Sequence, residues 1–175
     1  MIFRNLKADE IDCRVAQTFT NKDNTIKGLT LLLYKDARCD MNVLDESGVL
    51  WQRKHYECKG NLFCSVGILI DGEWIWKDDC GAESYTEKEK GEASDSFKRA
   101  CVNWGIGREL YTSPLIYIPI ADHNGQAYFE VYEKNGKWHP KANFTVSELI
   151  VEDGKITHIT IINPKLKVTV FDWSA

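Results

Sequence analysis

The sequence contains no uninterrupted apolar run of about 18 residues, the length that a membrane-spanning helix requires. Its opening stretch, MIFRNLKADEIDCRV, becomes charged at the fourth position and therefore lacks the apolar core of a secretory signal. The six cysteines show neither CxxC nor CxxH spacing, which argues against a zinc site. They are Cys13, Cys39, Cys58, Cys64, Cys80 and Cys101. We therefore expect a cytoplasmic protein with reduced thiols and no membrane partner.

The motifs of the common nucleotide- and metal-dependent enzymes are also absent. The sequence has no GxxxxGK[ST] phosphate-binding loop, no HExxH zinc motif and no GxSxG nucleophile motif. The four histidines lie far apart in the chain, without the spacing of a metal site. They are His55, His123, His139 and His158. We therefore expect a protein that is not an enzyme, with no metal and no cofactor.

The charge balance is mildly acidic. The chain has 22 Lys and Arg residues against 26 Asp and Glu residues, a formal net charge of −4. This balance argues against a protein that covers its whole surface with nucleic acid. It is still compatible with a basic groove, because phosphate binding depends on local charge.

Residues 51–81 have the pattern of a three-stranded antiparallel meander. Their apolar and alternating runs are separated by Lys59-Gly60-Asn61 and by Asp71-Gly72. An Asp-Gly pair between two such runs is typical of a tight hairpin turn.

The next segment predicts a helix over about 87–104. Its apolar residues have helical spacing and form one stripe. The stripe consists of Ala93, Phe97, Ala100 or Cys101, and Trp104. Gly105 and Gly107 would end the helix. We expect the stripe to pack on the meander, with small residues such as Ser96 allowing a close approach.

The segments before the meander are less regular. A helix is predicted within the first twenty residues, where Ile11, Val15 and Phe19 have helical spacing. An extended segment at 28–35 and a short helix at 36–48 follow it.

After Pro114 the pattern changes to about five further strands, divided by Asn-Gly and Asp-Gly pairs. The expected fold class is therefore α+β. We expect an antiparallel β-β-β-α core with one helix packed on the meander in residues 1–113, and a small all-β extension, packed on this core, in residues 114–175.

The adjacent cations Lys98 and Arg99 stand in the middle of the predicted long helix, and two interpretations are open. As ordinary helix surface, Arg99 can pair with Asp95, which stabilises a helix by a few tenths of a kcal/mol. As a binding site, the two cations, about 100° apart around the helix, can neutralise phosphates.

Other residues could complete such a site. The further cations that the fold could bring alongside are Arg38, Arg53 and Lys54. The side chains that could stack bases are Trp51, Trp74 and Trp76, although most tryptophans in sheets belong to the core.

A different pattern is compatible with a metal-dependent nuclease. Glu57 and Lys59 form an ExK pair downstream of Asp40 and Asp45. Carboxylates of this kind could hold Mg²⁺, and the lysine could steady the attacking water. However, Lys59 falls in a predicted turn, and ExK pairs arise by chance in a chain with 27% charged residues. We keep this nuclease as an alternative.

The segment EASDSFKRACVNWGIGRELY, residues 92–111, resembles the helix motif of the Rad-fifty-two/Rad-twenty-two type of single-strand annealing proteins, which include phage recombinases. The shared pattern is a small residue, Ser or Thr, Asp, a small residue, Leu or Phe, Lys-Arg-Ala and an aromatic-Gly end. The preceding order is also similar: a short helix with an arginine, then Trp51, then three antiparallel strands. The resemblance covers about residues 5–113.

This resemblance implies a β-β-β-α unit that assembles into a ring or arc, with single-stranded DNA in a basic groove around the outside. Lys98 and Arg99 stand where the family's Lys-Arg pair lines that groove, and Arg38 best matches a further arginine. Two basic positions of the family are occupied here by Val102 and Ile70, which implies a less basic groove.

The implied function is ATP-independent binding and annealing of single-stranded DNA in homologous recombination and double-strand break repair, in a bacterial cell or a phage-infected host. The expected partners are single-stranded DNA, further copies of the chain and a single-strand-binding protein. The alternatives are the nuclease at Glu57 and Lys59, and a structural or interaction protein that kept the fold without DNA binding.

Overall fold

The computed structural model describes residues 3–82 and 88–175. Its fold class is α+β with antiparallel sheets, as the sequence predicts. No helix within the described residues is long and apolar enough to cross a bilayer. Each of the six cysteines is a free thiol.

The chain divides into two compact units. Unit 1 consists of Met1–Leu6 and Lys35–Arg108, and unit 2 consists of Lys7–Tyr34 and Glu109–Ala175. Unit 1 ends at Arg108, whereas the sequence analysis places the boundary after residue 113. The N-terminal segment differs from the expectation, because residues 7–34 belong to the same unit as the C-terminal strands.

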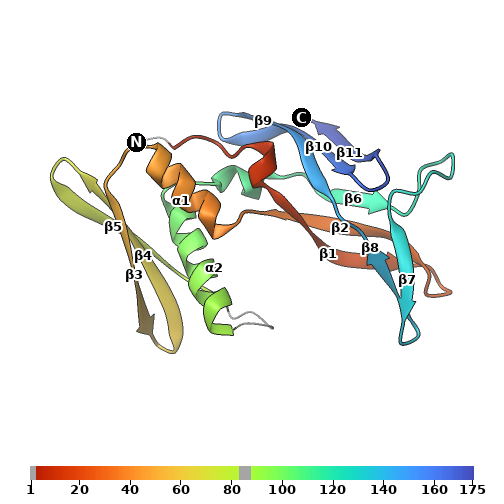
Figure 1. The fold of residues 1–175 in the computed structure, drawn as a ribbon, viewed down its shortest axis with the longest axis horizontal. Helices are drawn as coiled ribbons and strands as arrows, with labels where there is room; N and C mark the ends of the chain where they lie inside the picture. Colours follow the sequence, from red (N-terminus) through yellow and green to blue (C-terminus); the bar gives the residue numbers. More distant parts are fainter. Residues whose placement is uncertain (1–2, 83–87) are drawn as a thin grey trace. The chain divides into compact units, whose positions relative to one another are not determined.

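Unit 1 contains the predicted meander, with β4 between β3 and β5 (Figure 1). Its strands are β3 (Trp51–Cys58), β4 (Asn61–Ile70) and β5 (Glu73–Cys80). The turn between β4 and β5 is the predicted Asp-Gly turn, with φ angles of 51° at Asp71 and 86° at Gly72. Positive φ at both positions matches the right-handed twist of the two strands, and Asp-Gly adopts it readily.

Two helices complete unit 1. The first is α1 (Ala37–Glu46), which begins after Asp36, whose carboxylate accepts a hydrogen bond of 2.6 Å from the backbone N–H of Arg38. The second is α2 (Lys88–Asn103), which contacts β4 and β5. Both helices agree with the sequence prediction.

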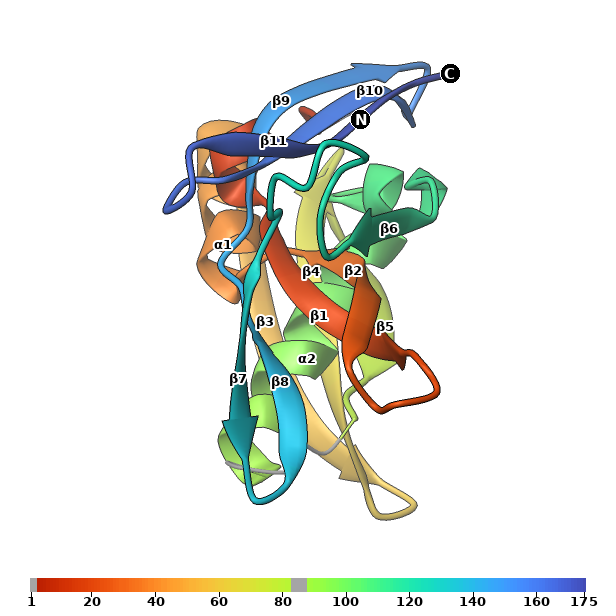
Figure 2. The ribbon, with the colours of Figure 1, turned by 90° about the vertical axis from the view of Figure 1, so that its right-hand side faces the viewer.

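Unit 2 is built on a six-stranded sheet in the order β11-β10-β9-β1-β2-β6, together with the separate hairpin β7-β8. Figure 2 shows β9, β10 and β11 next to one another. The strands are β1 (Asp12–Thr20), β2 (Ile26–Tyr34), β6 (Ile116–Pro119), β7 (Glu130–Lys134), β8 (Lys137–Lys141), β9 (Thr145–Glu152), β10 (Lys155–Asn163) and β11 (Val168–Ser174). The short 3-10 helix η1 (Ala8–Glu10) precedes β1, and a second one, η2 (Arg108–Thr112), follows α2.

The predicted N-terminal helix is wrong, because its residues form β1, which pairs with β2. The spacing of Ile11, Val15 and Phe19 is four residues, an even number that also fits the two-residue period of a strand. The register of β1 shifts between Val15 and Gln17, and this irregularity further blurs the alternation in the sequence.

Candidate nucleic-acid interface

The helix α2 is held on the meander by the predicted apolar stripe. Phe97, Ala100 and Cys101 are fully buried. The ring of Trp51 stacks on Phe97 with centroids 6.1 Å apart. The Trp104 indole N–H donates to the carbonyl of Val66 in β4 at 2.9 Å. These contacts fix the rotation of α2 and therefore decide which of its side chains reach solvent.

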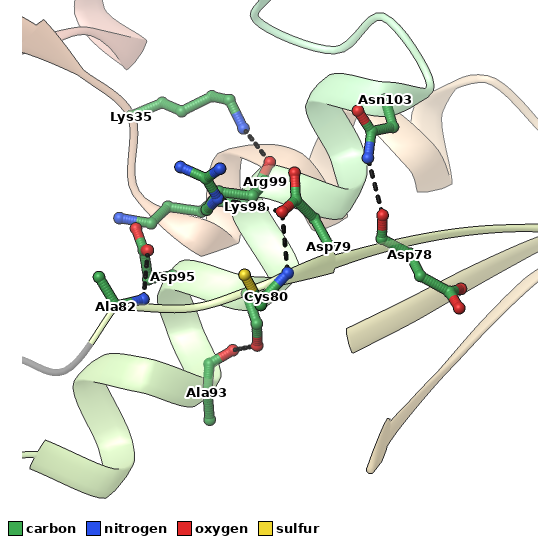
Figure 3. A network of polar contacts seen from close by, with 11 residues as sticks. Lys35, Asp78, Asp79, Cys80, Ala82, Ala93, Asp95, Lys98, Arg99 and Asn103 are labelled. Carbon is green, nitrogen blue, oxygen red and sulfur yellow. Dashed lines mark hydrogen bonds and ion pairs between the residues drawn. The ribbon is translucent and has the colours of Figure 1, made fainter. Parts of the chain in front are cut away.

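Arg99 lies on the side of α2 that this packing leaves exposed, and Lys98 beside it is partly buried. Arg99 is 47% exposed, and its Nε lies 3.3 Å from Oδ1 of Asp79 in β5 (Figure 3). An exposed ion pair of this kind contributes about 0–1 kcal/mol. Asp95, which the sequence offers as a partner of Arg99, accepts a backbone hydrogen bond from Ala82 at 3.0 Å.

The carbonyl of Lys98 is held by a buried lysine. Lys35 Nζ donates to it at 3.4 Å (Figure 3). The same ammonium also forms a buried ion pair with Asp40 of α1. Burial raises the pKa of Asp40 to about 6, and the neighbouring Lys35 opposes this rise. One oxygen of the Asp40 carboxylate, Oδ2, is buried without a hydrogen-bond partner. Asp40 and Lys35 therefore form a charged connection between α1 and α2.

The other predicted cations do not form one cluster with this pair. Arg38 is on the first turn of α1 with its side chain 85% exposed, 4.0 Å from the carboxylate of Asp36. Arg53 and Lys54 are neighbours in β3 and point to opposite faces of the meander, as alternation requires. The Arg53 guanidinium lies over Phe97 at 4.6 Å, on the α2 side, whereas Lys54 Nζ lies over Trp76 at 4.3 Å.

The three tryptophans are divided in the same way. Trp51 packs on α2 and donates its indole N–H to Asp45 at 2.7 Å, so it belongs to the core of unit 1. Trp74 and Trp76 lie on the opposite face of the meander, with ring centroids 6.1 Å apart.

Two further cations, neither of them predicted from the sequence, act at the C-terminal end of α2. Lys77 Nζ donates to the carbonyl of Asn103 at 2.9 Å and lies over the Trp104 ring at 4.4 Å. The Arg108 guanidinium donates to the carbonyls of Val102 and Asn103. Cations commonly bind the unpaired carbonyls of a helix end. The position of Arg108 just beyond the Gly105 stop signal could have indicated this role.

The nuclease alternative gains no geometric support. Lys59 is in the turn between β3 and β4 with φ of 54°. Asp45 bonds Trp51 at the start of β3, whereas Glu57 stands six residues further along that strand, about 20 Å away at a rise of about 3.3 Å per residue. Carboxylates that share Mg²⁺ lie within a few ångströms of each other. Among the side chains that the structure describes, those of residues 3–82 and 91–175, no group of three His, Cys, Asp or Glu residues could hold a metal ion.

Comparison with protein-family models, curated proteins and solved structures found no match to this chain. The resemblance to the annealing proteins therefore depends on the α2 segment and the order of elements before it.

Proposed function

We propose that this protein binds single-stranded DNA through its phosphates and anneals complementary strands without ATP. The observation that carries the proposal is the position of Lys98 and Arg99 on α2. The buried side chains of Phe97 and Ala100 seat the helix on the meander, which leaves Arg99 exposed and the adjacent Lys98 partly exposed. The Lys-Arg pair also belongs to the segment that resembles the annealing proteins.

In this proposal the protein contacts the strand without reading its sequence. Contacts to phosphates position a nucleic acid but do not distinguish bases. The pairing edges of the bases stay available to a second strand, and base pairing supplies the specificity of annealing.

The local charge favours many weak contacts over one strong site. Asp79 lies beside Arg99 and lowers the attraction of this surface for a phosphate. Several copies along one strand would compensate, because linked weak sites give a high overall affinity. We therefore include self-association, as a ring or arc, in the proposal. The protein would act in the cytoplasm of a bacterial cell or a phage-infected host, together with a single-strand-binding protein.

The test is the annealing of two complementary labelled oligonucleotides in EDTA without ATP. We expect the unmodified chain to accelerate annealing and the Lys98→Ala/Arg99→Ala variant to lose this acceleration. Each phosphate contact contributes about 0.7 to the slope of log K against log salt for single strands, so the variant should lose about 1.4 from that slope. Lys134→Ala/Lys137→Ala is the matched control, because it removes two exposed cations from the β7-β8 hairpin of unit 2.

Annealing by the unmodified chain that is unaffected in the Lys98/Arg99 variant would move the phosphate site elsewhere. No acceleration by the unmodified chain would refute the proposed function. Strand scission in a parallel reaction that contains Mg²⁺ in place of EDTA would favour the nuclease instead.

A further inference from the structure

One face of the meander is not covered by α2, and aromatic side chains gather on it. Side chains alternate along each strand, so the residues that share this face follow from the strand register. We call it the aromatic face. Its aromatic and charged side chains are Lys54 and Tyr56 of β3, Phe63 of β4, and Trp74, Trp76 and Asp78 of β5. Tyr56 is 38% exposed and Trp74 is 40% exposed.

The rings on this face are arranged in two pairs. Tyr56 and Phe63 stack with centroids 5.5 Å apart and planes 19° apart. Trp74 and Trp76 lie 6.1 Å apart with planes inclined by 32°. Rings in such pairs support one another, so their orientations are set before any partner arrives.

Trp76 lies flat against the sheet because Gly67 stands opposite it in β4. A Cβ atom at Gly67 would come within 2.8 Å of the Trp76 ring. The absence of a side chain at this position therefore allows the ring to rest on the backbone.

The charges of the aromatic face are arranged asymmetrically. The carboxylate of Asp78 accepts hydrogen bonds from the hydroxyls of Tyr56 at 2.8 Å and Ser65 at 2.5 Å. Lys54 holds its ammonium 4.3 Å from the Trp76 ring, and no carboxylate among the described side chains, those of residues 3–82 and 91–175, forms an ion pair with it. The Asp78 carboxylate is thus hydrogen-bonded within the face, whereas the Lys54 ammonium contacts the Trp76 ring.

We infer that the aromatic face stacks the bases of the bound single strand, with Trp74 and Tyr56 as the exposed rings and Lys54 as the contact to an adjacent phosphate. A purely apolar partner would bury the Lys54 charge without a counter-ion, which is costly. A nucleotide supplies an aromatic base and a phosphate together. Exposed aromatic side chains on antiparallel sheets stack bases in other single-strand binders.

This inference rests on the proposed function and adds the location of the base contacts. It also gives the two groups of residues different tasks. Lys98 and Arg99 would contact phosphates only, whereas the aromatic face would distinguish a strand with bases from one without them.

The experiment compares oligo-deoxythymidine with an abasic oligonucleotide of the same length, by fluorescence anisotropy of the labelled strand at fixed salt. We expect the unmodified chain to bind the thymidine strand more tightly than the abasic one. Stacking on an aromatic side chain contributes about 1–3 kcal/mol per base, so Trp74→Ala should weaken thymidine binding about tenfold. Its abasic affinity should not change.

The matched control is Trp138→Ala, which removes a tryptophan that is 41% exposed in unit 2 and should leave both affinities unchanged. Trp74→Phe keeps a ring and should retain most of the preference for thymidine. Lys98→Ala/Arg99→Ala should weaken both oligonucleotides by the same factor. Circular dichroism of each variant checks that it is folded.

An unchanged thymidine preference in folded Trp74→Ala would overturn the inference and leave the proposed function intact. The inference is overturned in the same way if Trp74→Ala alters only the sedimentation of the protein, because the face would then be a contact between copies. If the unmodified chain binds neither oligonucleotide, the proposed function fails and the inference fails with it.

Discussion

Replacing Lys35 by Met should destabilise unit 1 strongly, because it leaves the buried carboxylate of Asp40 without its counter-ion. Both side chains are buried, with relative exposures of 4% for Lys35 and 0% for Asp40. Oδ1 of Asp40 would lose the ammonium, and Oδ2 already has no hydrogen-bond partner. Breaking a buried pair by removing one partner costs about 3–5 kcal/mol. We expect a value near the upper end of that range at pH 7.

The double variant Lys35→Met/Asp40→Leu should recover most of this loss. Replacing a whole buried pair by apolar side chains of similar volume is often neutral or stabilising. The difference between the single and double variants therefore measures the charge left unpaired, separately from the change in packing.

The pH dependence gives a second measure of the same pair. The folded-state pKa of Asp40 is about 6, above its ordinary value of 3.8, so folding favours the neutral carboxyl. Its contribution to stability is fully present below pH 3.8 and is lost as the pH rises through about 6. Without Lys35 the pKa of Asp40 should rise further. The deficit of Lys35→Met relative to the unmodified chain should thus shrink between pH 7 and pH 5.

The assay is urea denaturation at the two pH values, followed by tryptophan fluorescence. A loss below about 1 kcal/mol for Lys35→Met at pH 7 would refute the reasoning, since it is far below the cost of an unpaired buried charge. A deficit that grows towards pH 5 would refute it equally.

Three further substitutions test other parts of unit 1. Gly67→Ala should cost about 1–3 kcal/mol in urea denaturation, because its Cβ would displace the Trp76 ring; an unchanged midpoint would contradict this contact. Phe97→Ala should cost about 3–5 kcal/mol and alter the near-ultraviolet circular dichroism of Trp51, which stacks on it; a loss below about 1 kcal/mol would show that α2 is held by other contacts. Glu57→Ala should change stability by less than about 0.5 kcal/mol and leave annealing rates unaltered, since Glu57 is exposed. A large loss of stability would contradict this exposure, and a loss of annealing would place Glu57 in the working surface of the protein.

The meander and α2 could be predicted from the sequence because their signals are local. The Asp71-Gly72 turn and the apolar stripe of α2 each occupy neighbouring positions in the chain. The membership of residues 7–34 in unit 2 could not be predicted, because it depends on the pairing of β1 with β9 and of β2 with β6. Strand partners this far apart leave no periodic pattern in the sequence.

The candidate site could be predicted only in part. The outward position of Lys98 and Arg99 follows from the apolar stripe, because the stripe residues Phe97 and Ala100 flank the pair in the sequence. Neighbouring side chains of a strand point to opposite faces of the sheet. The separation of Arg53 from Lys54 could therefore have been predicted from the sequence. The Lys35–Asp40 pair had no signal, because burial of a charge depends on two helices meeting, and the sequence shows only two ordinary charged residues.

The division of the chain also has a consequence for synthesis on the ribosome. The chain passes between the units after Leu6, before Lys35 and after Arg108. The residues at these three crossings lie close together in unit 1: a Cβ at Gly107 would lie 2.4 Å from Cε of Lys35 and 3.4 Å from Cδ1 of Leu6. Unit 1 can therefore close as soon as Arg108 has emerged. The hairpin β1-β2 is synthesised first, but its neighbouring strands β6 and β9 follow much later in the chain. Its apolar residues therefore stay exposed to solvent until those strands have been synthesised. We expect chains truncated after Arg108 to contain a folded unit 1 and an aggregation-prone N-terminal hairpin.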